Sequence, residues 1–401
     1  MDVNQSLALL AGLSPAQFMR RHWQKKPLLV RQALPGFQPL LSRTALFKLA
    51  AKEQVESRLI VQQAKGWRMK RGPFAPRGLP PLSQKAWTLL VQGVDLHDAG
   101  AHELLQKFRF VPDARLDDLM ISFATEGGGV GPHFDSYDVF LLQASGRRRW
   151  KIGRQKDLTL QEGVPLKILQ NFEPEQEFVL EAGDMLYLPP RYAHDGIAEA
   201  SASGEGCMTY SIGFRSPGRG ELAGELLQRL AEFSEDDAAG DAPAGRRASK
   251  AADIYKDPGQ GATATPAALP AELAAFASQA VLDALKDPLA LACVLGEYMT
   301  EPKPSVWFDE ATDEWDADAA KAGRAAIRLD ARTRMMYDAN HVFINGESYR
   351  AKGADATLMH RLADGRGLAP HELRKAGASA MALLADWHDA GWLRLELSAD
   401  P

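Results

Sequence analysis

Apolar and polar residues alternate with different periods along the chain, and the period changes twice. Residues 1–110 predict a mainly helical region with one strand-like entry at Pro27–Arg31. Residues 117–215 predict short strands separated by Gly and Pro, at Leu119–Ala124, Asp138–Gln143, Arg148–Ile152, Met185–Leu188 and Met208–Phe214. Strands of this length and spacing are typical of a small all-β barrel or jelly roll.

Helical spacing returns after Arg215, over Gly220–Phe233 and again over residues 271–300. Residues 235–270 between them are rich in Ala, Gly, Asp and Pro and predict a surface loop. The rest of the chain predicts a β stretch near Ala325–Tyr349, helices near Ala356–Leu362 and Pro370–Ala390, and a last strand at Trp392–Leu397. A helix pair on a small sheet resembles a winged helix.

The length and composition fit a multidomain globular protein. A chain of 401 residues is expected to form two or three domains, and 45% hydrophobic with 25% charged residues is ordinary. We expect no signal peptide and no membrane span, because no apolar stretch is long enough. We expect Cys207 and Cys293 to be buried free thiols. The expected location of the protein is the cytoplasm.

Charge argues against nucleic-acid binding and is compatible with a basic partner. The net charge is −5, and residues 301–401 hold 13 Lys or Arg against 17 Asp or Glu, hence 13 − 17 = −4. A DNA reader needs clustered cations, so we expect the winged-helix-like region to pack or to dock a partner.

His133-Phe134-Asp135 places two metal-ligand side chains on the same face of a strand. Alone this is weak, because about 9 × 52/401, or roughly one, such triplet is expected by chance. Its context strengthens it: a Gly-rich turn, Gly127–Pro132, precedes it, and His194 follows a strand stopped by two prolines. Two His and one carboxylate are the ligand set of non-haem Fe(II) oxygenases, with catalytic zinc as a competing reading.

The chain resembles the JmjC-type 2-oxoglutarate oxygenases, and specifically the bacterial ribosomal oxygenases of the YcfD type. The resemblance spans residues 18–216. It rests on the blocks His22–Pro27, Gly72–Phe74, Trp87–Gln92, Asp117–Phe123, Gly127–Asp138, Gly146–Trp150 and Tyr210–Arg215. Residues 235–270 depart from the family pattern as a variable insertion.

The resemblance implies an α+β fold with a double-stranded β-helix (jelly-roll, cupin-like) catalytic domain over residues 1–216. It implies a helical dimerisation segment over 217–300 and a winged-helix-like domain over 301–401. The implied cofactor set is Fe(II), 2-oxoglutarate and O2. The implied reaction is hydroxylation of an arginine β-carbon in large-subunit ribosomal protein sixteen, with a homodimer as the expected assembly.

Strand alternation places Arg148 on the same face as Trp150 and Ile152, whereas Arg147 and Arg149 face the other way. Arg148 also falls where the family's cosubstrate arginine lies, and a guanidinium can hold a carboxylate bidentately. Ser122 is expected as a second hydrogen-bond donor to that carboxylate. The alternative, a solvated basic turn, fits Arg147 and Arg149.

Asp118, Tyr137 and Ser211 match positions that line the substrate pocket in this family. Asp118 is expected to pair with the target guanidinium, Tyr137 to form a wall beside it, and Ser211 to accept a hydrogen bond. A role of Asp118 in a turn or a helix cap remains an alternative. The same oxygenase acting on a histidine or on a nucleic acid, and a non-catalytic winged-helix regulator, remain competing functions.

Overall fold

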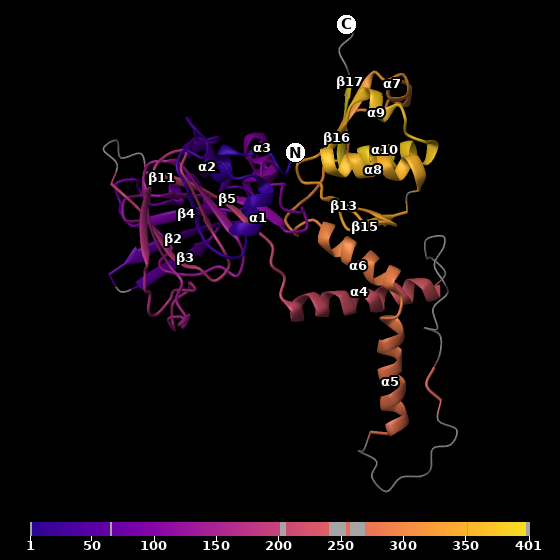
Figure 1. Cartoon of the computed structure of the whole chain (residues 1–401), viewed down its shortest axis with the longest axis horizontal. Helices are drawn as coiled ribbons and strands as arrows, with labels where there is room; N and C mark the ends of the chain where they lie inside the picture. The colour runs from indigo at the N-terminus through magenta and orange to yellow at the C-terminus, as the bar shows by residue number, and fades with distance from the viewer. Residues whose placement is uncertain are drawn as a thin grey trace. The chain divides into compact units, whose positions relative to one another are not determined.

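The computed structural model describes residues 2–64, 66–200, 206–239, 254–256, 269–350 and 352–397 (Figure 1). The chain forms two compact units, Met1–Ser216 and Pro217–Pro401. The further division of the second unit at residue 300 stays a prediction. None of the helices in the described ranges combines the length and the apolar character that crossing a membrane requires.

The first unit is built on two antiparallel sheets. Its strands are β1 (Leu28–Val30), β2 (Ser57–Gln63), β3 (Gly66–Arg71), β4 (Trp87–Val91), β5 (Leu116–Ala124), β6 (Val139–Ser145), β7 (Arg148–Gly153), β8 (Gln176–Leu180), β9 (Met185–Leu188), β10 (Ala193–Ala198) and β11 (Cys207–Phe214). The large sheet has the order β1-β9-β6-β11-β5-β4-β2-β3, and the small sheet has the order β10-β7-β8. The predicted double-stranded β-helix is confirmed.

Strand β6 shows how the sheets pack. Its Val139 and Leu141 point into a core shared with Trp150 and Ile152 of the small sheet. Its Phe140 and Leu142 point to the other side, into the larger core under the helices. Because successive side chains of a strand alternate between its two faces, one apolar strand serves two cores.

Helices cover the outer face of the large sheet. They are α1 (Pro15–Arg21), α2 (Arg43–Leu49) and α3 (Ala99–Gln106), with the short 3-10 helices η1 (Ala8–Leu10), η2 (Pro76–Gly78) and η3 (Val94–Leu96). Phe18 of α1 is fully buried, and its ring centroid lies 5.4 Å from that of Phe140 and 5.0 Å from that of Tyr187.

The prediction of a mainly helical region over residues 1–110 is incomplete, because it misses three strands. This region supplies β2, β3 and β4, which extend the large sheet, in addition to β1 near the predicted entry at Pro27–Arg31. All five residues of β4 are buried, so the strand has no polar–apolar alternation that would reveal it. The five strands predicted within residues 117–215 match β5, β6, β7, β9 and β11 to within three residues at each end, whereas β8 and β10 were not predicted.

The second unit begins with the helices α4 (Arg219–Ala239), α5 (Ala271–Ala284) and α6 (Pro288–Thr300). Leu230 of α4 is buried against Ala290 and Val294 of α6. The helix predicted over 271–300 is two helices, because Pro288 starts a new one behind its Asp287 cap. The loop predicted at 235–270 overlaps the end of α4, and its residues 240–253 and 257–268 lie outside the described residues.

The remainder of the second unit matches the predicted winged helix. Its elements are α7 (Ala317–Lys321), β12 (Ala325–Leu329), β13 (Met335–Tyr337), β14 (Val342–Ile344), β15 (Glu347–Tyr349), α8 (Gly353–Gly365), β16 (Gly367–Leu368), α9 (Pro370–Leu373), α10 (Ala378–Asp389) and β17 (Leu393–Leu397). The sheets run β16-β12-β17 and β13-β14-β15. The single helix expected at Pro370–Ala390 is divided into α9 and α10, with Gly377 at the start of α10.

Candidate functional site

His133 and His194 are brought together by a backbone bridge between the turn that follows β5 and the start of β10. The His133 amide donates to the His194 carbonyl at 2.9 Å, and the His194 amide donates back at 2.8 Å. The preceding turn depends on glycine: Gly131 has φ +79°, and a Cβ there would lie 2.7 Å from Ile168 and 2.8 Å from the Trp67 ring. The Gly-rich approach therefore sets where His133 emerges.

The structure brings His133, Asp135 and His194 into one cluster. One ligand atom from each lies within 4.8 Å of the other two. His194 Nε2 is 3.7 Å from Asp135 Oδ2, and the two imidazole centroids are 4.2 Å apart. His194 is buried while His133 and Asp135 are partly exposed, so the cluster is closed on one side and open to solvent on the other.

Backbone carbonyls fix the orientation of both imidazoles. His133 Nδ1 lies 2.9 Å from the Gly131 carbonyl, and His194 Nδ1 lies 2.9 Å from the Tyr192 carbonyl. A carbonyl only accepts, so each Nδ1 carries the proton and each Nε2 keeps a lone pair. Burial, helped by the nearby His133, lowers the pKa of His194 to about 4, so this ring is neutral at physiological pH.

This donor set fits a divalent cation. Two neutral imidazole nitrogens and one carboxylate face a common point, and each ring has the carbonyl partner that metal-bound histidines typically have. Three protein ligands leave the remaining positions of an octahedral ion to small molecules. Among the residues that the structure describes, this is the one group of at least three His, Cys, Asp or Glu that could hold a metal ion.

Arg148 is a buried cation with unsatisfied donors. It is 5% exposed, and among the described residues its Nε and one terminal nitrogen have no hydrogen-bond partner. Its other terminal nitrogen donates to Ser122 Oγ at 3.4 Å. Because a buried guanidinium without an anion is costly, this geometry fits a carboxylate ligand.

The prediction that Arg148 faces opposite to its neighbours is confirmed. Arg147 and Arg149 are exposed on the outer face, and both form ion pairs with Glu199. The Ser122 hydroxyl donates to the Thr209 carbonyl at 3.3 Å and accepts from Arg148. Its single proton is therefore engaged here, and its role as a donor to a cosubstrate stays a prediction.

Asp118 is buried on β5, on the same face as Ser122. Its Oδ2 accepts from Gln92 Nε2 at 2.8 Å and from the Gly93 amide at 3.1 Å. Oδ1 points toward Gly213 of the neighbouring strand, where a Cβ would lie 3.7 Å away. The bond to Gly93 gives Asp118 the turn role that the sequence left open.

Tyr137 lies among carboxylates. Burial, together with nearby Asp135, Asp118 and Asp117, raises the pKa of its phenol, so the ring stays neutral. The side chain is nevertheless 39% exposed, so one side remains accessible. Ser211 is partly buried on β11, opposite Met120. The acidic surroundings of Tyr137 suit a cationic guest.

Gln92 is a site residue whose role was not predicted from the sequence. Its amide nitrogen donates to Asp118, and its amide oxygen accepts from Arg58 at 3.1 Å. Only the block Trp87–Gln92 pointed to it. Its partner lies 26 residues away and becomes a neighbour because β4 and β5 pair.

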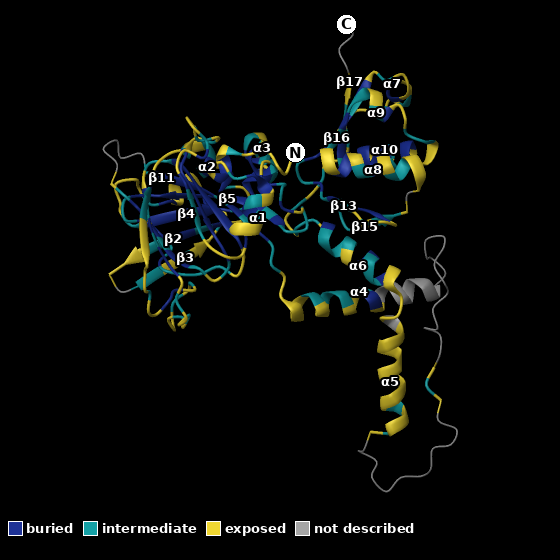
Figure 2. Ribbon diagram, viewed as in Figure 1, coloured by how far each residue is buried: buried dark blue, intermediate teal, exposed yellow. Residues whose placement is uncertain are grey.

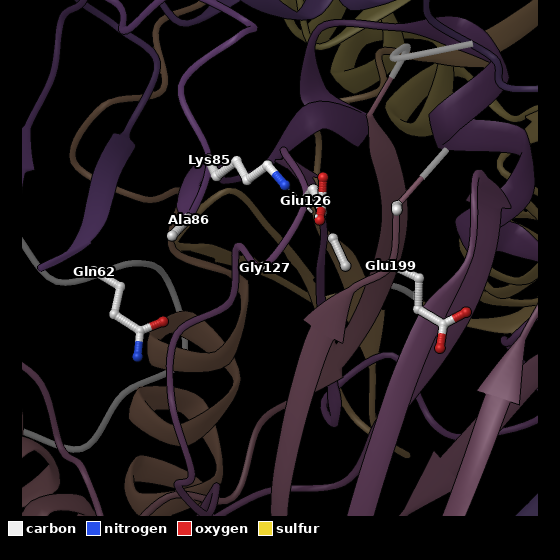
Figure 3. Close-up of a pocket in the computed structure, with 8 residues that line it drawn as sticks. Gln62, Lys85, Ala86, Glu126, Gly127 and Glu199 are labelled. Carbon is white, nitrogen blue, oxygen red and sulfur yellow. Dashed lines mark hydrogen bonds and ion pairs between the residues drawn. The ribbon is translucent and has the colours of Figure 1, made fainter. Parts of the chain in front are cut away.

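A separate pocket of about 660 Å³ opens beside the ends of β5 and β10. Its lining includes the ion pair Lys85–Glu126, with 2.8 Å between the charged atoms, and Glu199 (Figure 3). None of the predicted site residues lines this pocket. Lys85 and Glu126 pair with each other, and Glu199 pairs with Arg147 and Arg149, so every charged side chain described in this lining has a partner of opposite charge.

Comparison with known proteins agrees with the geometry. The model of the JmjC domain matches residues 103–222, and that of the ROXA-like winged helix matches residues 283–394. The chain is 34% identical to the ribosomal protein uL16 3-hydroxylase of Escherichia coli, over 82% of this chain and 84% of that protein. It is 36% identical to a probable ribosomal oxygenase of Haemophilus influenzae, over 52% of each chain.

Solved structures of E. coli YcfD share the whole architecture. One X-ray structure matches with a TM-score of 0.78 and 29% identity, over 95% of this chain and 98% of that one. Another, of YcfD in complex with cobalt and 2-oxoglutarate, matches with a TM-score of 0.75 and 28% identity, over 95% and 98% of the two chains.

Proposed function

Because this chain belongs to the JmjC-domain ribosomal oxygenases, we propose that it is an Fe(II)- and 2-oxoglutarate-dependent hydroxylase of an arginine β-carbon in ribosomal protein uL16. One observation carries the chemistry: His133, Asp135 and His194 converge with both Nδ1 atoms held by backbone carbonyls. The expected cytoplasmic location belongs to the same proposal.

Iron bound with 2-oxoglutarate and O2 supplies the oxidation that turns a C–H bond into C–OH, with succinate and CO2 as the other products. His133, Asp135 and His194 would hold the metal on one face and leave the opposite face for the cosubstrates. The Gly131 and Tyr192 carbonyls hold the Nδ1 atoms of the two rings, so the rings would bind the metal in the orientation they already have.

Arg148 would receive the far carboxylate of 2-oxoglutarate. Its two unpaired nitrogens offer the planar fork that a carboxylate accepts. Ser122 holds one terminal nitrogen of the guanidinium, and the Trp150 ring lies 5.8 Å from its central carbon. The side chain is therefore positioned before the cosubstrate arrives.

Asp118, Tyr137 and Ser211 would bind the target arginine. Gln92 and Gly93 fix the Asp118 carboxylate, so the anion that meets the guanidinium has one orientation. Tyr137 supplies a neutral aromatic face. An arginine remains charged at any working pH, and this acidic wall is suited to it.

We include a homodimer formed through the helices α4–α6. On α5 and just after it, Val281, Leu282 and Leu285 are 53, 55 and 42% exposed (Figure 2). Adjacent exposed aliphatic side chains on a helix favour burial against a partner. Size-exclusion chromatography with light scattering tests this, and a Val281→Asp/Leu282→Asp variant should be monomeric if the proposal holds.

The test of the activity uses the full chain with Fe(II), 2-oxoglutarate and recombinant uL16. Peptide mass spectrometry should find one added oxygen atom on an arginine, together with one succinate per turnover. The added oxygen on a histidine of a ribosomal protein would favour the second candidate function. Absence of both products would leave the non-catalytic regulator.

A further inference from the structure

The segment 57–86 has a charge composition unlike the rest of the chain. It contains seven Lys or Arg and no Asp or Glu, although about 30 × 52/401, or roughly four, acids would be expected at the chain's average composition. The chain as a whole carries a net charge of −5. The segment therefore has a local net charge of +7, which the net charge of the whole chain does not reveal.

The fold presents four of these cations on or next to a strand at the edge of a sheet. The segment forms the hairpin β2–β3, and β3 is the last strand of the large sheet. Arg68, Lys70 and Arg71 are exposed on β3, and Arg77 is exposed on η2 just beyond it. Arg68 and Lys70 are two residues apart, so their side chains leave the same face about 7 Å apart.

These four cations have no ion-pair partner in the described part of the chain. Two cations flanking them do: Arg58 lies 4.0 Å from Glu56, and Lys85 lies 2.8 Å from Glu126. Acids farther from the edge than the Debye length, about 8 Å at physiological ionic strength, are largely screened from these cations. The edge of β3 is therefore a positive surface on an acidic protein.

Protection of the edge against aggregation explains only part of this pattern. A lysine such as Lys70 is a common guard on an edge strand. Three of the four cations are arginines, whose planar fork suits the oxygens of a phosphate. The uL16 substrate of the proposed function is itself expected to be basic, so it would be repelled by this edge.

The hairpin also lies beside the candidate site. Trp67 of β3 packs against Gly131, two residues before His133. Arg58 of β2 is close enough to Tyr137 to influence its pKa. The proposed RNA surface and the candidate site are therefore connected through the same hairpin, with Trp67 and Arg71 on one face of β3 and Arg68 and Lys70 on the other.

We propose that the β2–β3 hairpin binds the phosphate backbone of RNA, through Arg68, Lys70, Arg71 and Arg77. Contacts of this kind are independent of sequence and depend strongly on salt. They would allow the enzyme to engage its protein target together with an RNA strand that the target carries. The binding itself does not depend on the proposed hydroxylation.

The test measures the fluorescence anisotropy of a labelled 20-nucleotide single-stranded RNA with the full-length protein between 50 and 200 mM salt. The variant Arg68→Glu/Lys70→Glu should bind at least about tenfold more weakly at 50 mM salt. The slope of log affinity against log salt should fall by roughly 1.4, or about 0.7 for each lost phosphate contact. Arg68→Gln/Lys70→Gln should give a smaller change in the same direction.

The matched control is Lys48→Glu/Lys107→Glu, which makes the same charge change at two exposed lysines on α2 and after α3. Equal loss of affinity in both charge-reversed variants would overturn the proposal, as would no RNA binding by the parent protein at 50 mM salt. Equal competition by poly-glutamate would assign the edge to an acidic protein segment instead. Thermal melting checks that each variant is folded.

Turnover of a free uL16 peptide separates this proposal from the proposed function. It should be the same in the parent protein and in Arg68→Glu/Lys70→Glu, because neither residue belongs to the metal, cosubstrate or arginine sites. RNA binding without any peptide turnover would refute the hydroxylase and keep the RNA surface. Turnover without RNA binding would do the reverse.

Discussion

Replacement of Arg148 by methionine should have opposite effects on ligand binding and on the stability of the ligand-free protein. The guanidinium is 5% exposed, and two of its nitrogens lack partners in the described structure. Breaking a buried charge pair costs about 3–5 kcal/mol. At about 1.4 kcal/mol per factor of ten, 2-oxoglutarate should bind roughly 10²- to 4 × 10³-fold more weakly to Arg148→Met.

Without ligand, the same replacement removes unsatisfied buried donors, each of which costs about 1–3 kcal/mol. It also removes the contact with the Trp150 ring, which contributes about 0.5–2 kcal/mol. We expect a net gain of about 1 kcal/mol, or roughly 2–4 °C in Tm for a unit of this size. Arginine at this position thus favours cosubstrate binding at the expense of stability.

The assay is differential scanning fluorimetry of the metal-loaded protein with and without 2-oxoglutarate, together with calorimetric titration. The parent should gain Tm on adding 2-oxoglutarate, and Arg148→Met should start higher and gain little. Arg149→Met is the control, because Arg149 is the exposed neighbour that pairs with Glu177 and Glu199. The reasoning fails if Arg148→Met binds 2-oxoglutarate within tenfold of the parent, or if Arg149→Met loses as much affinity.

Three other variants test the rest of the site. Asp118→Asn should abolish turnover of an arginine peptide yet leave 2-oxoglutarate decay without substrate largely intact, and loss of both activities in a succinate assay would assign Asp118 to the fold instead. Burial lowers the pKa of His194 from 6.5 to about 4, so this residue stabilises the metal-free fold above pH 6.5. Urea titrations should show the free energy of unfolding falling by up to about 3 kcal/mol between pH 6.5 and 4. The same profile should be flatter in His194→Asn. Gly131→Ala should lose about 1–3 kcal/mol, because its φ is +79° and its Cβ would meet Trp67 and Ile168; a metal affinity equal to that of the parent would contradict the role of this turn in placing His133.

The sequence predicted the strands whose ends are marked by turn residues. Gly183 and Pro189 enclose Met185–Leu188, and β9 has these bounds. The inward direction of Arg148 followed from the two-residue period of a strand, since Trp150 and Ile152 share its face. Local signals of this kind need no knowledge of the partner strands.

What the sequence missed depends on pairing between distant segments. The strand Trp87–Val91 is an interior strand between β2 and β5 and is buried on both faces, so it reads as a plain apolar run. The hydrogen bonds of Asp118 to Gln92 and Gly93 likewise arise from the pairing of β4 with β5. Contacts that depend on which strands are neighbours in the sheet produce no periodic pattern in the sequence of either strand.

Local clusters of charge indicate ligand-binding regions of this protein, whereas its net charge does not. The first unit places a cation at Arg148, carboxylates around Tyr137 and unpaired cations along β3, and these regions call for ligands of opposite sign. Burial separates Arg148 from solvent. Salt screens the electrostatic potential of the cations along β3 beyond about 8 Å. A net charge of −5 therefore excludes a protein that is basic overall, but it does not exclude a phosphate-binding edge. The quantity that decides phosphate binding is the charge within one Debye length of a surface. For this protein that charge depends on which strand forms the edge of the sheet.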